Sequence, residues 1–534
     1  MTTTEPNTHN QSLLRLVRAI HRRPSRRVPW RWLVVALLLV QFAIRSHNLT
    51  VQDPFIDESY HILRASVVWD FDANPGRFAN GKVLLYFWLG LFESSLLASV
   101  FTSRMAIALF SLVSGAAIYQ IGRLLYNRQA GVLALALYMA LPLAFFHERL
   151  ALADPFASAF ACLAVWRSLT FARRPSAREG IILGALLALT TLAKLTLGLL
   201  PLLPVAAAII YAPWRSVRGL RLWIKAYVPP LAIAAGVVIL AWAPLAVPAY
   251  LARNSDNPFV LVNSFNVQAP HHKALALHAY TSESLALVRD FTDTTWLALA
   301  LAAPAAWVAL SRRDSRQIRS LAVLAVWLAL TVGLVLVSAT LTSARYFMPA
   351  SPPLALLIAL GVVGLLESPG RRRVVGIAAL AATTAWTAWF AAPFVYRTWT
   401  SPFDLPLHGI NYNEYLSGWI TSDDAVRAVA DQLNSLDPAP DAVYASFTLC
   451  ELMYFYTDLP LVCLPQIATQ DDLIGHLEVN LAPGEAAYFV SFDEDNALLD
   501  TPTLRADLIG WFERSRTNRP IWLWKVWWED DIDV

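Results

Sequence analysis

Residues 102–156 read TSRMAIALFSLVSGAAIYQIGRLLYNRQAGVLALALYMALPLAFFHERLALADPF. They contain two apolar runs, near 103–123 and 130–146, and the turn between these runs carries Arg123 and Arg128. A helix needs about 20 apolar residues to cross the hydrocarbon core of a bilayer. We therefore interpret the two runs as an antiparallel pair of membrane-spanning helices, with a basic turn on one side and a polar turn on the other.

The composition of the whole chain favours the same interpretation. Of its 534 residues, 57% are hydrophobic and only 15% are charged, and the mean hydropathy is +0.47. Soluble domains are more polar than this, so we predict a polytopic membrane protein. Disorder and a disulfide scaffold are excluded by the 12% aromatic content and by the presence of only three cysteines. No nucleic-acid partner is expected, because the basic residues form short clusters between apolar runs.

The same criterion predicts eleven membrane-spanning helices. They centre near residues 33–48, 103–123, 130–146, 152–171, 179–194, 198–212, 226–249, 294–311, 321–341, 350–366 and 374–392. The fifth and sixth are short and could form a re-entrant pair. A further apolar stretch, Val83–Phe101, is amphipathic and contains Glu93. We interpret it as an interfacial helix in the first outer loop.

The positions of Lys and Arg predict the orientation, because basic loops stay in the cytoplasm. Basic clusters precede the first span and follow at every second loop, at Arg123 and Arg128, Arg173 to Arg178, Arg215 to Lys225, Arg312 to Arg319 and Arg371 to Arg373. Residues 1–32 are thus expected to be a cytoplasmic basic N-terminus of an inner-membrane protein, and 33–392 its transmembrane domain. A cleaved signal peptide is the alternative for residues 1–45, but no small-residue cleavage site follows Ile44.

Residues 393–534 are expected to form an extracytoplasmic domain. Residues 400–534 carry 6 Lys and Arg against 23 Asp and Glu, whereas residues 1–399 carry 36 against 16. Alternating helix-like and strand-like stretches predict a small α/β domain. The predicted helices are Ser422–Leu436, Leu449–Thr457, Asp471–Leu481 and Leu504–Arg514, and the predicted strands are AVYAS, LVCL, AYFVSF and IWLWKVWW. Cys450 and Cys463 lie in this domain, where they could pair or simply be buried.

Ionisable residues beside apolar spans are candidates for function, and here they gather on the outer side. The first outer loop contains Asp57 and Glu58 within FIDESYH. Neighbouring residues of a helix diverge by about 100°, so only one of these carboxylates is expected to face a given substrate. A solvated acidic loop is the alternative reading.

A second cluster lies in the outer turn FFHERLALADPF, with His147, Glu148, Arg149 and Asp154. Arg149 and Asp154 could pair or could both face a cavity. Alternatively, Asp154 could cap a helix that begins at Pro155, since Asp at the cap and proline in the first turn are both favoured.

Further cations are predicted at outer helix ends, against the positive-inside rule. Lys194 and Arg345 could neutralise an anionic ligand such as a phosphate, or could be snorkelling side chains. His271 and His272 could hold a divalent metal, but two histidines without spaced partners are a weak signal. The chain has no Gly-rich phosphate loop, HExxH or GxSxG motif, so ATP hydrolysis, zinc proteolysis by that motif and α/β-hydrolase chemistry have no support.

In this order, several segments resemble the GT-C superfamily of polytopic glycosyltransferases, in particular the branch of aminoarabinose transferases and protein O-mannosyltransferases. The resemblance rests on the opening stretch and on DESYH, GKVLLYFWLGLF, LAKLTLGLLPLL and SARYFMPASPPLALL. It implies a polyprenyl-phosphate sugar donor, an acceptor reached from outside and direct displacement with inversion. It does not specify the donor sugar or the acceptor, which can be a lipid, a glycan or a protein.

The resemblance also implies roles for individual residues. Asp57 matches the catalytic carboxylate of the first loop, and Asp154 matches the Asp of the family's Arg-Leu-then-Asp turn. The implied substrate contacts are Glu58, Tyr60, Lys82, Arg149, Lys194, Arg345 and Tyr346. Gly81 replaces a Glu that helps to bind metal in the aminoarabinose transferases, so no metal site is assigned.

Two alternatives remain at this point. A flippase or other transporter of a lipid-linked sugar would place ionisable residues near the middle of the bilayer and would use repeated halves. The predicted spans are nearly free of charge and show no internal repeat, which favours the enzyme. A polysaccharide ligase or polymerase would share the donor class but would not predict DESYH or the α/β domain.

Overall fold

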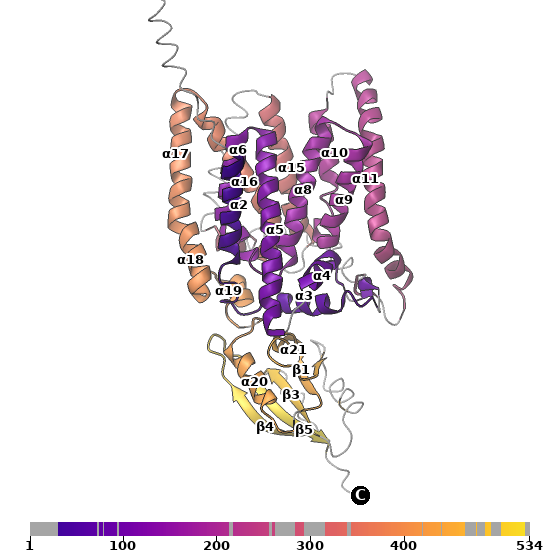
Figure 1. The fold of residues 1–534 in the computed structure, drawn as a ribbon, viewed down its shortest axis with the longest axis vertical. Helices are drawn as coiled ribbons and strands as arrows, with labels where there is room; N and C mark the ends of the chain where they lie inside the picture. Colours follow the sequence, from indigo (N-terminus) through magenta and orange to yellow (C-terminus); the bar gives the residue numbers. More distant parts are fainter. Residues whose placement is uncertain are drawn as a thin grey trace, which may run out of the picture.

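The computed structural model consists of a helical bundle with a small sheet domain at one end (Figure 1). It describes residues 30–528 apart from 72–73, 78, 93–95, 213–216, 256–258, 262–283, 293–314, 339–342, 419, 439, 465–476, 478–485 and 493–503. The predicted span at 294–311 and the predicted helix Asp471–Leu481 therefore lie outside the described residues, apart from Leu477.

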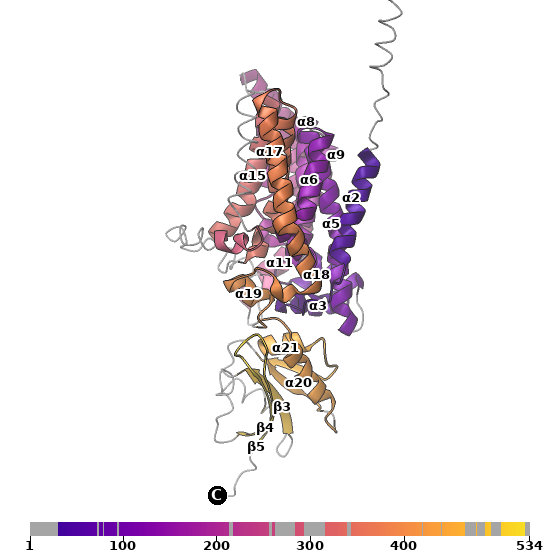
Figure 2. The same cartoon turned by 90° about the vertical axis from the view of Figure 1, so that its left-hand side faces the viewer.

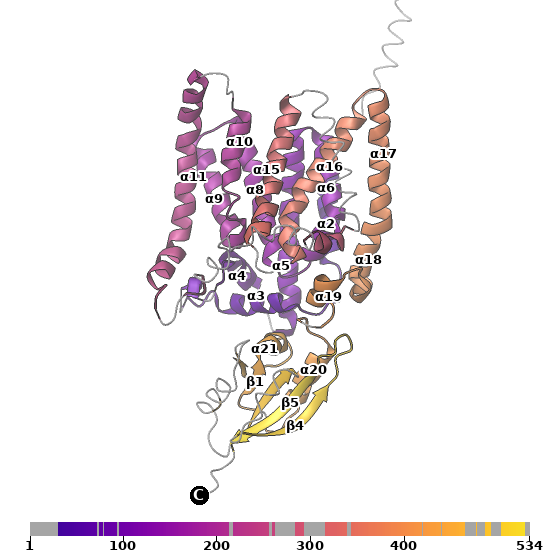
Figure 3. The same cartoon turned by 180° about the vertical axis from the view of Figure 1, so that it is seen from behind.

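The bundle is built from long apolar helices that run along its axis (Figures 1 and 3). Its main helices are α2 (Trp30–Ser46), α5 (Leu96–Leu125), α6 (Arg128–Ala140), α7 (Pro142–His147), α8 (Ala153–Arg173), α9 (Ala177–Ala193), α10 (Leu202–Tyr211), α11 (Val217–Leu251), α15 (Ser315–Ser338), α16 (Ser351–Leu366), α17 (Arg371–Trp386) and α18 (Ala392–Thr400). The prediction of a mainly helical membrane protein is confirmed.

Five helical stretches among the described residues are long and apolar enough to cross a membrane. They are Ala98–Leu125, Ala153–Arg173, Val217–Leu251, Ala344–Leu366 and Arg371–Thr400. Other apolar helices are shorter: α2 and α9 have 17 residues each, and the path through α6 and α7 is broken before Pro142. The number of eleven spans stays a prediction.

Short sequence signals position these helices. Asn127 caps α6 by accepting a hydrogen bond from the backbone N–H of Ala130 at 2.9 Å, as expected for an N-cap residue. Two glycines then allow α5 and α6 to pack closely, because a Cβ on Gly122 would lie 2.7 Å from the Cα of Gly131. This contact fixes the helix pair that the opening stretch of sequence predicts.

The segment between α2 and α5 lies across the end of the bundle that faces the sheet domain (Figures 1 and 3). It contains α3 (Ile56–Val67), a 3-10 turn η1 (Pro75–Arg77), α4 (Val83–Leu89) and a 3-10 turn η2 (Gly90–Phe92). The stretch Val83–Phe101 is thus not one interfacial helix. Its first part is α4 with η2, and from Leu96 onward it already belongs to α5.

The sheet domain follows the last bundle helix. A π turn, η6 (Thr387–Ala391), joins α17 to α18, and a 3-10 turn η7 (Pro402–Asp404) and α19 (Gly409–Tyr415) lead to α20 (Asp424–Asn434). The strands are β1 (Val443–Ser446), β2 (Leu461–Leu464), β3 (Ala486–Phe492), β4 (Leu504–Phe512) and β5 (Ile521–Trp528), with α21 (Phe447–Met453) after β1. Their order is β2-β1-β3-β5-β4, with parallel β1 pairs and antiparallel β5 pairs.

One predicted element of this domain is wrong. Residues Leu504–Arg514 were expected to form a helix, but Leu504–Phe512 is strand β4, antiparallel to β5 at the edge of the sheet. The register shifts between Leu508 and Gly510, as at a β-bulge, and this extra residue disturbs the two-residue alternation of the stretch. Pairing with β5 decides the structure here, which local sequence could not reveal.

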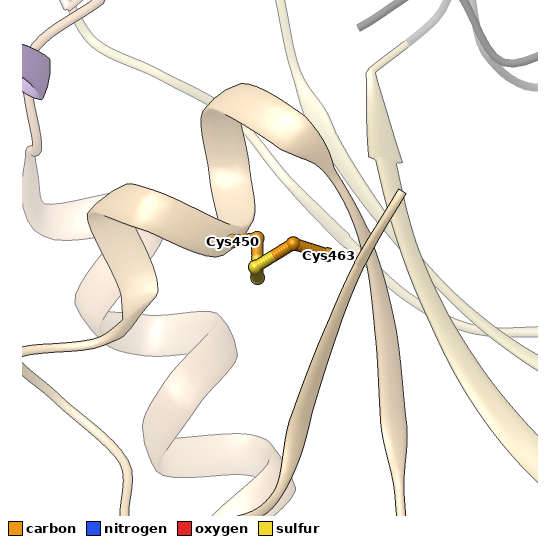
Figure 4. Close-up of a disulfide and its surroundings, with 2 residues drawn as sticks. All are labelled: Cys450 and Cys463. Carbon is orange, nitrogen blue, oxygen red and sulfur yellow. A yellow bond between two sulfur atoms is a disulfide. The ribbon is translucent and has the colours of Figure 1, made fainter. Parts of the chain in front are cut away.

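The helices α20 and α21 cover one face of the sheet. Their apolar residues form a core with side chains of β1, β3 and β5, including Val429, Leu449, Val490 and Leu523. Cys450 of α21 is joined to Cys463 of β2 by a disulfide (Figure 4). The question that the sequence left open is thus answered in favour of pairing, and α21 is fastened to the sheet.

Candidate active site

The charged residues singled out in the sequence gather at the end of the bundle that faces the sheet domain. Helix α3 crosses this end, and Figure 2 shows it between the bundle and α21. The other contributors are the N-cap of α4, the first turn of α8, the C-cap of α9, a 3-10 helix η5 (Ala344–Ala350) and α19. His271 and His272 lie outside the described residues.

Asp57, in the first turn of α3, stands at the centre of this cluster. Its Oδ2 lies 2.8 Å from Arg345 Nη1 and 3.7 Å from Lys82 Nζ. The side chain of Asp57 is 29% exposed and that of Lys82 is 18% exposed, whereas Arg345 is 9% exposed. Asp57 and Lys82 are therefore the members of the cluster that a substrate could reach most easily.

Lys82 is held by a histidine one helical turn beyond Asp57. Its Nζ donates to His61 Nε2 at 2.9 Å, and His61 Nδ1 donates to the carbonyl oxygen of Ala151 at 2.7 Å. Before Lys82, the backbone turns at Gly81 with a φ of 74°, a conformation that glycine adopts without strain. Gly81 stands where the aminoarabinose transferases have a Glu, and the backbone conformation at this position explains why a glycine is present.

Asp154 and Lys194 form a second ion pair. Lys194 Nζ donates to Asp154 Oδ1 at 2.5 Å, and both side chains are nearly buried. Lys194 also lies 4.5 Å from the centre of the Tyr346 ring. The N-cap of α8 is Leu152, so Asp154 does not cap a helix beginning at Pro155, and the capping alternative does not hold.

Arg345 connects Asp57 to a group that the sequence did not single out. Its Nη2 lies 3.8 Å from Glu414 Oε1 in α19, and Ser343 donates to the other Glu414 oxygen at 2.8 Å. The arginine therefore lies between two carboxylates that are far apart in the sequence. Glu414 falls in a polar stretch without a motif, so no sequence signal could have identified it.

Glu58 and Arg149 make buried hydrogen bonds that hold the segments around the site together. Glu58 is fully buried and accepts from Arg104 Nε and Nη2 at 2.8 and 2.6 Å and from the backbone N–H of Ala151 at 2.7 Å. Arg149 donates to carbonyl oxygens at the end of α2, including that of His47 at 2.6 Å. Cations are favourable at helix C-termini. Arg149 and Asp154 were expected to pair or face a cavity together, but each has other partners.

Arg104 is the second important residue that the sequence analysis missed. Besides Glu58, its guanidinium donates to the carbonyl oxygens of Leu49 and Gln52 at 2.6 and 2.7 Å. An arginine inside an apolar helix is costly unless it is paired, and its position within a predicted span was an available signal.

The electrostatics of the cluster follow from burial and from the excess of nearby cations. Burial raises the pKa of Asp57, but Arg345 and Lys82 outweigh it and hold this pKa below its usual range. Burial lowers the pKa of Lys82 to about 8, against the opposing effect of Asp57. Burial and then Lys82 keep the pKa of His61 well below its usual value. Asp57 is thus an anion, and His61 a neutral acceptor.

The carboxylates and histidines of the cluster are the side chains that could bind a metal ion. Among residues 30–528, as far as the structure describes them, no group of three His, Cys, Asp or Glu side chains could hold a metal ion. Asp57 and Asp154 are both engaged by cationic side chains. The described side chains therefore do not fit a metal ion.

This architecture has known counterparts. Residues 83–247 match the family described as dolichyl-phosphate-mannose-protein mannosyltransferase. The structure of ArnT from Cupriavidus metallidurans bound to undecaprenyl phosphate matches with a TM-score of 0.60 and 16% identity, covering 93% of this chain and 98% of ArnT. The chain has the GT-C fold.

Two further solved structures have the GT-C fold in common with this chain. The Archaeoglobus fulgidus oligosaccharyltransferase in complex with Zn and sulfate has a TM-score of 0.54 at 12% identity, over 87% of this chain and 68% of that one. The mycobacterial arabinofuranosyltransferase AftD has a TM-score of 0.51 at 15% identity, over 94% and 40%. A search of curated proteins finds no match. The predicted resemblance to the GT-C superfamily is confirmed, and the prediction of a glycosyltransferase agrees with all these relatives.

The matched segment covers only part of the charged cluster. It includes Asp154 and Lys194, whereas Asp57, Lys82 and Arg345 lie outside residues 83–247. Folding brings the two groups together at one end of the bundle. Lys194 lies 4.5 Å from the ring centre of Tyr346, the neighbour of Arg345, and the backbone N–H of Leu195 donates to the carbonyl oxygen of Gly81, the neighbour of Lys82, at 3.0 Å.

Proposed function

We propose that the protein transfers a sugar from a polyprenyl-phosphate donor to an acceptor at the outer face of the cytoplasmic membrane. The observation that carries this proposal is the partly open Asp57 carboxylate, held between Lys82 and Arg345 beside the Lys194 and Asp154 pair. Such an arrangement suits a reaction in which an anionic group leaves while a carboxylate accepts a proton.

In the proposed reaction, the acceptor oxygen attacks the anomeric carbon of the sugar. The bond between that carbon and the phosphate oxygen breaks, and its electron pair leaves with the polyprenyl phosphate. Lys82, Lys194 and Arg345 stabilise the charge on this leaving group. The acceptor's proton moves to Asp57, and a single displacement inverts the configuration of the sugar carbon.

Donor binding would also tune the base. In the free site, Lys82 and Arg345 hold the pKa of Asp57 low, which makes it a weak proton acceptor. A donor phosphate that pairs with these cations would cancel part of their effect and raise this pKa. Asp57 would then become a competent base when the donor is present.

The other predicted site residues have supporting roles in this proposal. Asp154 positions Lys194, Tyr346 packs against the Lys194 ammonium, and Glu58 anchors α3 through Arg104. The known ligands of related folds agree with the donor class: ArnT was solved with undecaprenyl phosphate, and the archaeal AglB with dolichol-phosphate and an inhibitory peptide.

The base is tested by Asp57→Asn. We expect transfer of labelled sugar from polyprenyl phosphate to fall by about a thousandfold or more, since general-base catalysis contributes 10²–10⁴-fold, while the melting temperature in detergent is retained. The control is Asp70→Asn, an exposed carboxylate in the same outer loop. A fully active Asp57→Asn protein would contradict the mechanism.

The donor site is tested by native mass spectrometry of the full chain with added undecaprenyl phosphate. We expect one bound lipid, and weaker binding after Lys82→Ala, Lys194→Ala or Arg345→Ala, because each removes a cation from the phosphate. Arg253→Ala, which removes an exposed cation after α11, should bind like the parent. Absence of binding at excess lipid would overturn the donor assignment.

A further inference from the structure

Arg345 of η5 lies between two carboxylates and approaches each with a different nitrogen. Its Nη1 is 2.8 Å from Asp57 Oδ2, and its Nη2 is 3.8 Å from Glu414 Oε1 in α19, at the end of the bundle that faces the sheet domain (Figure 2). Nη1 has no hydrogen-bond partner in the described part of the chain, in spite of its closeness to Asp57. Arg345 thus acts on both carboxylates mainly through its charge, which little water screens because the residue is 7% exposed.

Glu414 adds a negative charge to a cluster that contains several cations. Its Oε2 accepts a hydrogen bond from Ser343 Oγ at 2.8 Å, and its side chain is 13% exposed. Burial raises the pKa of Glu414, whereas the Arg345 guanidinium and the Ser343 hydroxyl lower it. A donated hydrogen bond and an adjacent cation both favour the carboxylate form. Glu414 is therefore an anion that balances part of the Arg345 charge.

Helix α19 is attached to the bundle by residues other than Glu414. Asn411 Nδ2 donates to Asp290 Oδ2 at 2.9 Å, and Tyr415 is 1% exposed, with its ring centre 5.2 Å from that of Phe55. A buried ion pair adds little to stability, because desolvation of its charges offsets their attraction. The position of α19 therefore does not require Glu414, and the buried carboxylate needs another explanation.

We propose that Glu414 is a positioning residue that attracts the Arg345 guanidinium and thereby leaves Asp57 basic enough to accept the acceptor's proton. This proposal rests on the proposed transferase function and adds a residue to its mechanism. The interaction between the two carboxylates is reciprocal. Asp57 raises the pKa of Glu414, so the charge of Glu414 also raises the pKa of Asp57, against the lowering effect of Arg345.

The same negative charge weakens the donor site. Arg345 is one of the cations proposed to bind the donor phosphate, and Glu414 repels that phosphate at close range. Glu414→Gln removes the charge but keeps the size of the side chain and an oxygen that can accept from Ser343. We therefore expect tighter binding of the donor and slower proton transfer to Asp57, so that KM and kcat fall together. Loss of a purely structural contact would not lower KM.

The first measurement is native mass spectrometry of the full chain with undecaprenyl phosphate as the probe, which requires no turnover. We expect Glu414→Gln to bind this lipid about three- to tenfold more tightly than the parent, since a nearly buried ion pair exceeds the effect of exposed pairs. Initial rates of transfer from the labelled polyprenyl-phosphate sugar then give KM and kcat. KM should fall by the same factor, and kcat by about threefold, because a weaker base accepts protons more slowly.

Two matched variants separate the charge of Glu414 from its shape and position. Glu414→Asp keeps the charge and should retain most of the parental binding and rate. Asp431→Asn removes one charge from an exposed position of α20 and should behave like the parent in both measurements. Melting temperatures in detergent identify any variant that fails to fold, and Glu414→Ala provides the same comparison if Glu414→Gln does not fold.

The outcomes distinguish this role of Glu414 from the transferase mechanism. Equal or weaker lipid binding by Glu414→Gln would overturn the proposal, as would tighter binding with an unchanged kcat. Failure of both Glu414→Gln and Glu414→Ala to fold would make Glu414 a structural residue and would also overturn it. A parent protein that needs Asp57 for transfer but is unaffected by Glu414→Gln would leave the proposed function standing, whereas a fully active Asp57→Asn protein would contradict that function itself.

Discussion

Single side chains at the end of the bundle that faces the sheet domain differ in how many hydrogen bonds and ion pairs they make. Glu58 accepts from Nε and Nη2 of Arg104 and from the backbone N–H groups of Ala151 and Phe55, so it has no capacity left for a substrate. Asp57 faces two cations but remains 29% exposed. The adjacent carboxylates therefore differ in partners and exposure, as the helical divergence of neighbouring residues predicts.

The pH dependence of transfer is expected to depend on Lys82 and His61. The pKa of Lys82 is about 8, so its ammonium, and with it transfer, is lost as the pH rises through that value. The acceptor nitrogen of His61 stabilises the ammonium. His61→Leu should lower this pKa and move the alkaline limb of the pH profile to lower pH.

His61→Gln tests the same prediction in the other direction. The glutamine side-chain oxygen can still accept a hydrogen bond from Lys82, so this variant should keep most of the parental pH profile. The control is His408→Leu, at a histidine whose side chain is 79% exposed. The measurement is the initial rate of sugar transfer between pH 6 and pH 10. An alkaline limb that stays in place in His61→Leu would refute the role of His61.

Helices and strands have their positions fixed by contacts that are distant in sequence. Arg149 binds the carbonyl oxygens at the end of α2, and β4 exists because β5 pairs with it. Helix α21 is tied to β2 by the Cys450 and Cys463 disulfide. Each contact either supplies hydrogen-bond partners to backbone groups or cross-links two segments. It thereby selects one conformation where the local sequence allows more than one.

Removal of this disulfide should destabilise the sheet domain. The bridge closes a loop with a sequence separation of 13, and a loop of that length corresponds to about 3 kcal/mol in the chain-entropy account. Cys450→Ser with Cys463→Ser should lower the midpoint of thermal unfolding and speed proteolysis of residues 424–528. Cys162→Ala, at the buried free cysteine of α8, serves as the control; equal stability of the two variants would count against the bridge.

The bundle and the sheet domain are joined directly at the start of α3. Phe55 and Thr421 form an isolated β-bridge, and the backbone N–H of Ser422 donates to the carbonyl oxygen of Pro54 at 2.8 Å. Arg514, beyond β4, donates to the carbonyl oxygen of Thr421 at 2.9 Å and to Asp423 at 2.6 Å. The sheet domain is thereby held against the segment that leads into Asp57.

Loss of this junction should reduce activity without any change to the charged cluster. Arg514→Met leaves Asp423 buried without its partner, which costs about 3–5 kcal/mol, so we expect lower transfer rates and faster cleavage between the two parts by protease. Arg505→Met, at an exposed position of β4, should behave like the parent. If Arg514→Met transfers sugar at the parental rate, the junction is irrelevant to catalysis.

Hydropathy and charge in the sequence were sufficient to predict the membrane character, the α/β domain and most candidate residues of the site. These properties are local. An apolar run of sufficient length is stable in the hydrocarbon core of a bilayer, and an ionisable group beside it needs a function or a partner of opposite charge. Asp57, Asp154, Lys194 and Arg345 could thus be identified from their neighbours in the sequence, whereas Lys82 was identified from the resemblance to the GT-C superfamily.

The partners of these residues could not be predicted in the same way. Asp57 meets Arg345, Glu58 meets Arg104 and Arg345 meets Glu414 across long stretches of chain. Ion pairs depend on distance in space, which packing of the bundle sets, whereas sequence patterns report only nearby positions. For the same reason, strand β4 became visible only through its pairing with β5.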